Sequence, residues 1–306
     1  MGILGLSGKK QGILLMILSA LSFSAMQIVV SLSGGRIPVL EQVFFRNIVG
    51  VVVSFILITK RKGSYFGTKK DQPMLFSRSF FGFLGIITLF YAVNHAHQAD
   101  VTILSKMSPF LITIFAAIFL KEKISKMQIP AMILAFIGAF LVANPTFNSN
   151  YFPLIIAFCT SITAGICYTL LAYMKGKVDP QTILFHLFVF CSVASIPFMI
   201  GNFVVPTWTE LIYLILIGVF GWLGQITITL AYQKAPAAEV SVYNYTGIIF
   251  SMILGYVILG ENVSAASCMG GGLVIAASVL IYWYNNRLKG RNEEPVDPGK
   301  VEDTFV

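Results

Sequence analysis

The chain has 306 residues, of which 57% are hydrophobic and 11% are charged, and its mean hydropathy is +0.82. Soluble proteins carry about 25% charged residues, so this composition excludes a soluble domain and indicates that lipid is the main solvent. The net charge of +8 does not indicate nucleic-acid binding, because the cations lie in short segments between apolar runs.

Taken in chain order, the apolar runs predict about ten membrane-spanning helices. Lys9 and Lys10 precede the first run, which is too long for a signal peptide and is expected to be a retained helix. The charged, proline-containing segment 287–306 predicts a disordered tail. The expected spans are 12–33, 39–59, 74–94, 99–120, 127–145, 151–174, 181–203, 209–232, 238–259 and 266–285.

The positions of the cations predict the orientation of these spans. Roughly sixteen lysines and arginines fall on the side of the N-terminus, and only Arg36 falls in a loop on the other side. An excess of lysine and arginine is typical of cytoplasmic loops. We therefore expect a multi-pass protein of the plasma or inner membrane with both termini in the cytoplasm.

The second half of the chain repeats the first at a constant shift of 139 positions (261 − 122). Phe-Leu-Lys-Glu-Lys-Ile-Ser (119–125) aligns with Ile-Leu-Gly-Glu-Asn-Val-Ser (258–264). Because each copy holds an odd number of spans, the second must enter the membrane from the opposite side. The expected fold is an all-α membrane protein of about ten helices in two inverted five-helix repeats, an architecture typical of alternating-access carriers. The expected parts are an N-terminus (1–11), two repeats (12–145 and 151–286) and a cytoplasmic tail (287–306).

Several of these features resemble the drug/metabolite transporter superfamily, in particular ten-helix proteins built from two EamA domains. They are the Glu122 and Glu261 segments, Pro109 in the fourth span, Arg46 in Phe-Phe-Arg and the duplicated unit itself. The resemblance covers about 12–285 and implies a secondary transporter or exporter of small metabolites with a central cavity. It names no substrate, because the family transports many kinds of solute.

One departure from the family pattern concerns the first span. Small four-helix relatives carry a membrane-embedded glutamate there, which couples protons to cationic drugs. This chain offers only serines and Gln27 in that span, so proton-coupled export of cations is not expected.

Lys106 gives the strongest indication of a binding site. It lies nearly two turns into the fourth span, where it would line a cavity, snorkel to the surface or pair with an acid. Thr102 shares its helix face. Arg46 could join Lys106 in holding a carboxylate or phosphate, or pair with Glu41. The repeat partner of Lys106 is Tyr245, so the charge is not duplicated.

Other side chains in the spans are weaker candidates. Packing is the alternative for each, and Arg78 is interpreted as a cytoplasmic anchor. Asp100 and Glu239 occupy matching positions and would act as coupling or gate residues, or cap helix N-termini. The candidates for cavity lining are His186, Trp222, Gln225, Tyr243 and Asn244.

A structural role is predicted for two matching pairs of residues. Glu122 and Glu261 follow the ends of the fourth and ninth spans, where the helix dipole disfavours anions and another group must hold them. Gly82 and Gly221 are small enough to let helices approach closely. We expect the third and eighth spans to cross near the pseudo-twofold axis that relates the two repeats.

No metal site, cofactor or catalytic constellation is expected. The four cysteines lack Cys-x-x-Cys spacing, and no nucleotide-binding loop is present in the sequence. The predicted function is secondary-active transport of a small polar or zwitterionic metabolite bearing a negative group. The alternatives are a lipid or lysolipid flippase, a multidrug exporter, a membrane-embedded enzyme and a scaffold. The expected partners are a small-molecule substrate and the bilayer, and the oligomeric state is left open, a homodimer included.

Overall fold

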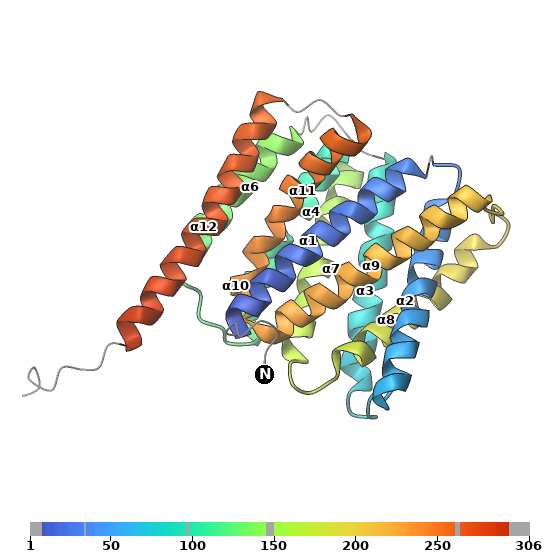
Figure 1. Ribbon diagram of the computed structural model, residues 1–306, viewed down its shortest axis with the longest axis horizontal. Helices are drawn as coiled ribbons and strands as arrows, with labels where there is room; N and C mark the ends of the chain where they lie inside the picture. The colour runs from blue at the N-terminus through green and yellow to red at the C-terminus, as the bar shows by residue number, and fades with distance from the viewer. Residues whose placement is uncertain (1–7, 34, 96–97, 145–149, 261–263, 294–306) are drawn as a thin grey trace, which may run out of the picture.

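The computed structural model describes residues 8–33, 35–95, 98–144, 150–260 and 264–293, and throughout these ranges the regular structure is helical (Figure 1). Seven helices of this part are long and apolar enough to cross a membrane, and two shorter apolar helices accompany them. The elements are α1 (Gly8–Leu32), α2 (Val39–Arg61), α3 (Gln72–His95), α4 (Gln98–Ser105), α5 (Ser108–Phe119), α6 (Gln128–Ala143), α7 (Tyr151–Tyr173), α8 (Pro180–Met199), α9 (Trp208–Lys234), α10 (Ala237–Val240), η2 (Ser241–Tyr245), α11 (Thr246–Leu254), η3 (Gly255–Leu259) and α12 (Ala265–Glu293).

One predicted span is interrupted and another changes its type of helix, and neither feature was predicted from the sequence. The fourth range holds α4 and α5, separated at Lys106 and Met107. Pro109 lies in the first turn of α5, where its missing N–H group costs no hydrogen bond. The ninth range is helical throughout, but it passes through α10, the 3-10 segment η2, α11 and the π-helical segment η3.

The helices pack in pairs that are distant in sequence. The principal pairs are α1 with α9, α3 with α7, α2 with α8 and α6 with α12. In Figure 1, α6 and α12 lie side by side at one edge of the molecule. A Cβ at Gly138 would lie 2.5 Å from the carbonyl oxygen of Gly270, so these two helices pack backbone to backbone. Glycine at this crossing lets the two backbones approach closely.

The expected crossing of the third and eighth spans is wrong. A Cβ at Gly85 of α3 would meet the side chain of Thr163 on α7 at 2.9 Å. On α9, a Cβ at Gly224 would meet Phe23 of α1 at 2.8 Å. The glycines therefore admit bulky side chains from helices of the other half, and α3 and α9 each pack on a different partner.

One face of the molecule carries the start of α1 and the end of α12, at the lower side of Figure 1. We call it the N-terminal face. The α2–α3 and α7–α8 connections lie there as well, with lysines such as Lys62, Lys69 and Lys175. The opposite face carries the α1–α2 and α8–α9 connections.

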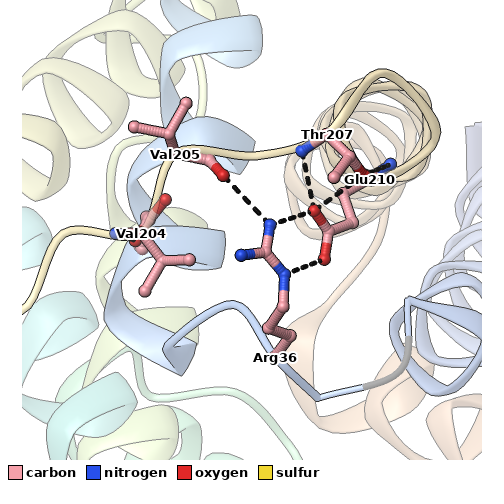
Figure 2. A network of polar contacts seen from close by, with 6 residues as sticks. Arg36, Val204, Val205, Thr207 and Glu210 are labelled. Carbon is pink, nitrogen blue, oxygen red and sulfur yellow. Dashed lines mark hydrogen bonds and ion pairs between the residues drawn. The ribbon is translucent and has the colours of Figure 1, made fainter.

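On the opposite face, Arg36 ties these two connections together (Figure 2). Its Nε donates to Glu210 Oε1 at 2.7 Å, and its Nη2 donates to the carbonyl oxygen of Val205 at 3.0 Å. Glu210 also completes a capping box with Thr207 at the start of α9. The hydrogen bond to Glu210 raises the pKa of the Arg36 guanidinium above its ordinary value. The link therefore stays charged at physiological pH.

Candidate functional site

A cavity of about 660 Å³ lies between the helices. It is bordered by the later part of α1, the first part of α2, the α4–α5 break, η2 and α11. Of these segments, the later part of α1 and the first part of α2 lie toward the opposite face. The volume suits a small-molecule ligand. The polar residues of its lining are Ser24, Gln27, Ser31, Gln42, Arg46, Lys106, Asn244, Ser251 and Ser267.

Lys106 lies in the break between α4 and α5 and lines this cavity. Its carbonyl oxygen, which the break leaves without a helical partner, accepts a 2.8 Å hydrogen bond from the hydroxyl group of Tyr245. Tyr245 is fully buried at the end of η2. Among the side chains that the structure describes, no acid forms an ion pair with Lys106. The lysine thus presents a positive charge to the cavity.

Arg46 lines the same cavity from α2. Its side chain lies across α9 at Gly221, where a Cβ would be 2.7 Å from Nε. The Nε atom is buried and has no hydrogen-bond partner within the described part of the chain. Glu41, the alternative partner weighed above, instead accepts from the backbone N–H of Val204 at 3.0 Å. Gly221 therefore makes room for Arg46.

The remaining lining candidates separate into two groups. Asn244 lines the cavity, whereas Gln225 lies deeper and accepts a hydrogen bond from Arg78. Trp222 packs in an apolar cluster with Leu184 and Phe188, and its Nε1 lacks a partner there.

Two further candidates do not border the cavity. Tyr243 is buried, with its hydroxyl group unpaired among the described residues. His186 Nδ1 lies 2.8 Å from Ser79 Oγ, between α8 and α3. Thr102 and Asp100 lie on α4, and their side chains are outside the described part.

The interpretation of Arg78 as a surface anchor is wrong. Only 2% of this residue is exposed. Its Nη1 donates to Cys167 Sγ at 3.6 Å, and its Nη2 donates to Gln225 Oε1 at 3.4 Å. The side chain therefore points into the bundle, toward α7 and α9.

At the N-terminal face, contacts around α10 join several elements. Glu122 accepts hydrogen bonds from the backbone N–H groups of Ala237 and Ala238, at 3.0 and 2.9 Å. These groups are free at the start of a helix, and its dipole favours the carboxylate. Lys9 forms an ion pair with Glu239, and Gln128 donates to the carbonyl oxygen of Ala238. Glu261 lies outside the described residues.

The sequence analysis missed several neutral residues of the cavity wall. Gln42, Ser251 and Ser267 line it, and Ser251 Oγ donates to Ser24 Oγ at 3.0 Å. Single serines and glutamines in membrane helices more often serve packing, so nothing local distinguished them. In the described part of the chain, no three His, Cys, Asp or Glu side chains gather as a metal site would require.

Multiple apolar helices around a polar cavity define the class of multi-pass membrane transport proteins. Residues 10–144 and 152–283 each match the EamA-like transporter family, and the chain belongs to this family, within the drug/metabolite transporter superfamily. The same family is matched twice along the chain.

Individual relatives are similar over most of their length. The pseudopaline exporter CntI of Pseudomonas aeruginosa is 30% identical over 274 residues, which cover 89% of this chain and 96% of the relative. Solute carrier family 35 member G1 of Mus musculus is 29% identical, with 87% and 76% covered. The S-adenosylmethionine uptake transporter of Rickettsia bellii is 25% identical, with 87% and 91% covered.

One solved crystal structure superimposes with a TM-score of 0.81 at 16% identity, covering 92% of this chain and 99% of its own. At that identity the similarity concerns the fold. The family and the named relatives support transport of a small molecule across a membrane.

Proposed function

We propose that this protein is a secondary-active carrier of a small polar metabolite that bears a negative group, working by alternating access around the cavity. The observation that carries the proposal is Lys106, a cation in a helix break that lines the cavity, which Arg46 also lines. Cations inside a membrane are costly and typically mark a substrate pathway. Broken helices that line a cavity are typical of carrier binding sites.

An inverted repeat is the second part of the proposal, and the packing supports it. At the shift of 139, α1 corresponds to α7 and α9 to α3, so the pair α1–α9 corresponds to α7–α3. In the pairs α2–α8 and α6–α12, each helix packs against its own repeat counterpart. Tyr245 bonds to Lys106, its own repeat partner 139 positions away. Residues that meet their own counterparts are expected on a pseudo-twofold axis.

The third part concerns orientation. The cation-rich N-terminal face is the cytoplasmic one by the positive-inside rule. The cavity then opens to the exterior, and the contacts of Glu122 and Lys9 close the cytoplasmic side. The conformation is accordingly outward-facing. Relatives include both an exporter and an uptake transporter, so the direction of transport is a matter for measurement.

The proposal is tested by counterflow into proteoliposomes with amino acids, organic acids, nucleotides, organic cations and lysophospholipids. We expect uptake of a solute with a carboxylate or phosphate, and at least a tenfold loss of that uptake in Lys106→Ala, because the charge that holds the solute is gone. Lys60→Ala is the matched control, since Lys60 is an exposed lysine on the N-terminal face. It should transport normally.

Two outcomes would contradict the proposal. Normal uptake of an anionic substrate by Lys106→Ala would remove the lysine from the site. Movement of lysophospholipids alone would indicate lipid flipping.

A further inference from the structure

Arg78 is a buried, charged residue that is not among the residues lining the cavity. It lies on the second turn of α3, and the groups that accept its hydrogen bonds, Cys167 Sγ and Gln225 Oε1, are uncharged. Its Nε has no partner within the described part of the chain. A guanidinium group in a protein interior is strongly destabilising unless an anion neutralises it.

Arg46 and Arg78 approach the same face of α9. The Arg46 side chain lies at Gly221, and Arg78 Nη2 reaches Gln225. Gly221 and Gln225 are four residues apart, one turn of the helix, so they lie on one face with about 5–6 Å between them. Since α9 runs toward the N-terminal face, Arg78 lies one turn deeper than Arg46. Arg46 thus lines the cavity, and Arg78 lies behind it, one turn further along α9.

No described acid neutralises this pair. Each carboxylate side chain that the structure describes binds another group, either a backbone N–H, a helix cap or a different cation. The like charges of Arg46 and Arg78 repel each other, more strongly in the interior than in water. An anionic ligand between them would remove both the repulsion and the cost of burial. The acids concerned are Glu41, Asp71, Glu122, Asp179, Glu210 and Glu239.

We propose that Arg46 and Arg78 form a deep subsite for a second anionic group, so that the transported solute is a dianion or polyanion, such as a dicarboxylate. One carboxylate binds Lys106 in the cavity, and another is held by the two guanidinium groups, whose planar N–H donors match a carboxylate. This inference rests on the proposed function, since it assigns the substrate class of the same carrier.

Binding to the purified protein tests the subsite separately from transport. The probes are succinate, its half-amide succinamate and citrate, at constant ionic strength, with thermal stabilisation in detergent as the measurement. Succinate and succinamate differ by one charge at nearly the same size. We expect wild-type protein to bind succinate and citrate at least tenfold more tightly than succinamate.

The variant Arg78→Gln should lose that preference, with succinamate affinity within about twofold of wild type, because Lys106 still holds one carboxylate. Arg78→Lys should restore part of it. Arg36→Gln, which changes an exposed arginine at the opposite face, is the control and should keep the full preference. If Arg78→Gln does not fold, Gly221→Ala supplies a second test, because its Cβ displaces the Arg46 side chain.

The outcomes separate the two proposals. Equal affinity of wild-type protein for succinate and succinamate, or full preference retained in Arg78→Gln, would overturn the subsite while leaving a monoanion carrier intact. Counterflow of cations or lysophospholipids alone would instead overturn the proposed function.

Discussion

Tyr245 satisfies a backbone group that the interrupted helix leaves open. Its hydroxyl group donates to the carbonyl oxygen of Lys106, and the side chain is fully buried. We expect Tyr245→Phe to lower the free energy of unfolding by about 1–3 kcal/mol, because a buried acceptor loses its partner. Denaturation in detergent measures the change. Tyr256→Phe is the control, since Tyr256 is 61% exposed, and an equal loss in both variants would contradict the prediction.

Three charged residues show how much of the site could be predicted from the sequence. Lys106 stood out because a lysine inside an apolar run is rare, and Arg46 because it lies two turns into a span. Arg78 was misread, since its distance from the start of α3, about 9 Å at 1.5 Å per residue, suits a surface anchor. Its side chain points into the bundle because its hydrogen-bond partners lie on α7 and α9. The sequence around Arg78 gives no sign of these distant partners.

At the scale of the helix pair, α6 and α12 depend on glycine at their crossing. A Cβ at Gly270 would overlap the carbonyl oxygen of Gly138, whereas a Cβ at Gly272 meets nothing within 4 Å. We expect Gly270→Ala to destabilise the protein by about 1–3 kcal/mol through forced separation of the helices. Gly272→Ala should be neutral or slightly stabilising. Thermal unfolding in detergent compares the two, and similar shifts would contradict this account.

The positions of the helices were readable from the sequence, but the interruptions were not. A run of about 20 apolar residues must be helical in lipid, because every backbone group needs a partner there. At the α4–α5 break that partner is the hydroxyl group of Tyr245, which lies in the other half of the chain. The periodicity around Lys106 therefore predicted a continuous helix with Thr102 and Lys106 on one face. In the structure the helix is broken at Lys106 instead.

For the whole molecule, the proposed orientation predicts which loops meet the exterior. Single cysteines at Lys62 and Asn202, both exposed positions, lie in connections on the two faces. In intact cells, an impermeant maleimide should label position 202 and leave position 62 unlabelled until the membrane is opened. Labelling of position 62 from outside would reverse the topology.

The closed N-terminal face predicts a shift between conformations. Glu122→Ala removes the acceptor for two N–H groups of α10, and about 1.4 kcal/mol of lost closure raises the open population about tenfold. A cysteine at the buried Ser241 should then react faster with N-ethylmaleimide, as measured by peptide mass spectrometry. Lys123→Ala, at an exposed neighbouring position, is the control. Unchanged labelling in Glu122→Ala would show that this carboxylate does not hold the face shut.

The bond between Tyr245 and Lys106 has a consequence for how such a chain could have arisen. If two separate five-helix proteins once assembled in opposite orientations, each residue at the axis would have faced an identical copy of itself. Two lysines would repel there, and two tyrosines would leave no cation. Once the genes are fused, each position can change independently, and one copy can keep the hydroxyl donor while the other gains the charge. If the proposed inverted repeat arose in this way, duplication followed by fusion would make a one-sided site available at the centre of a symmetric scaffold.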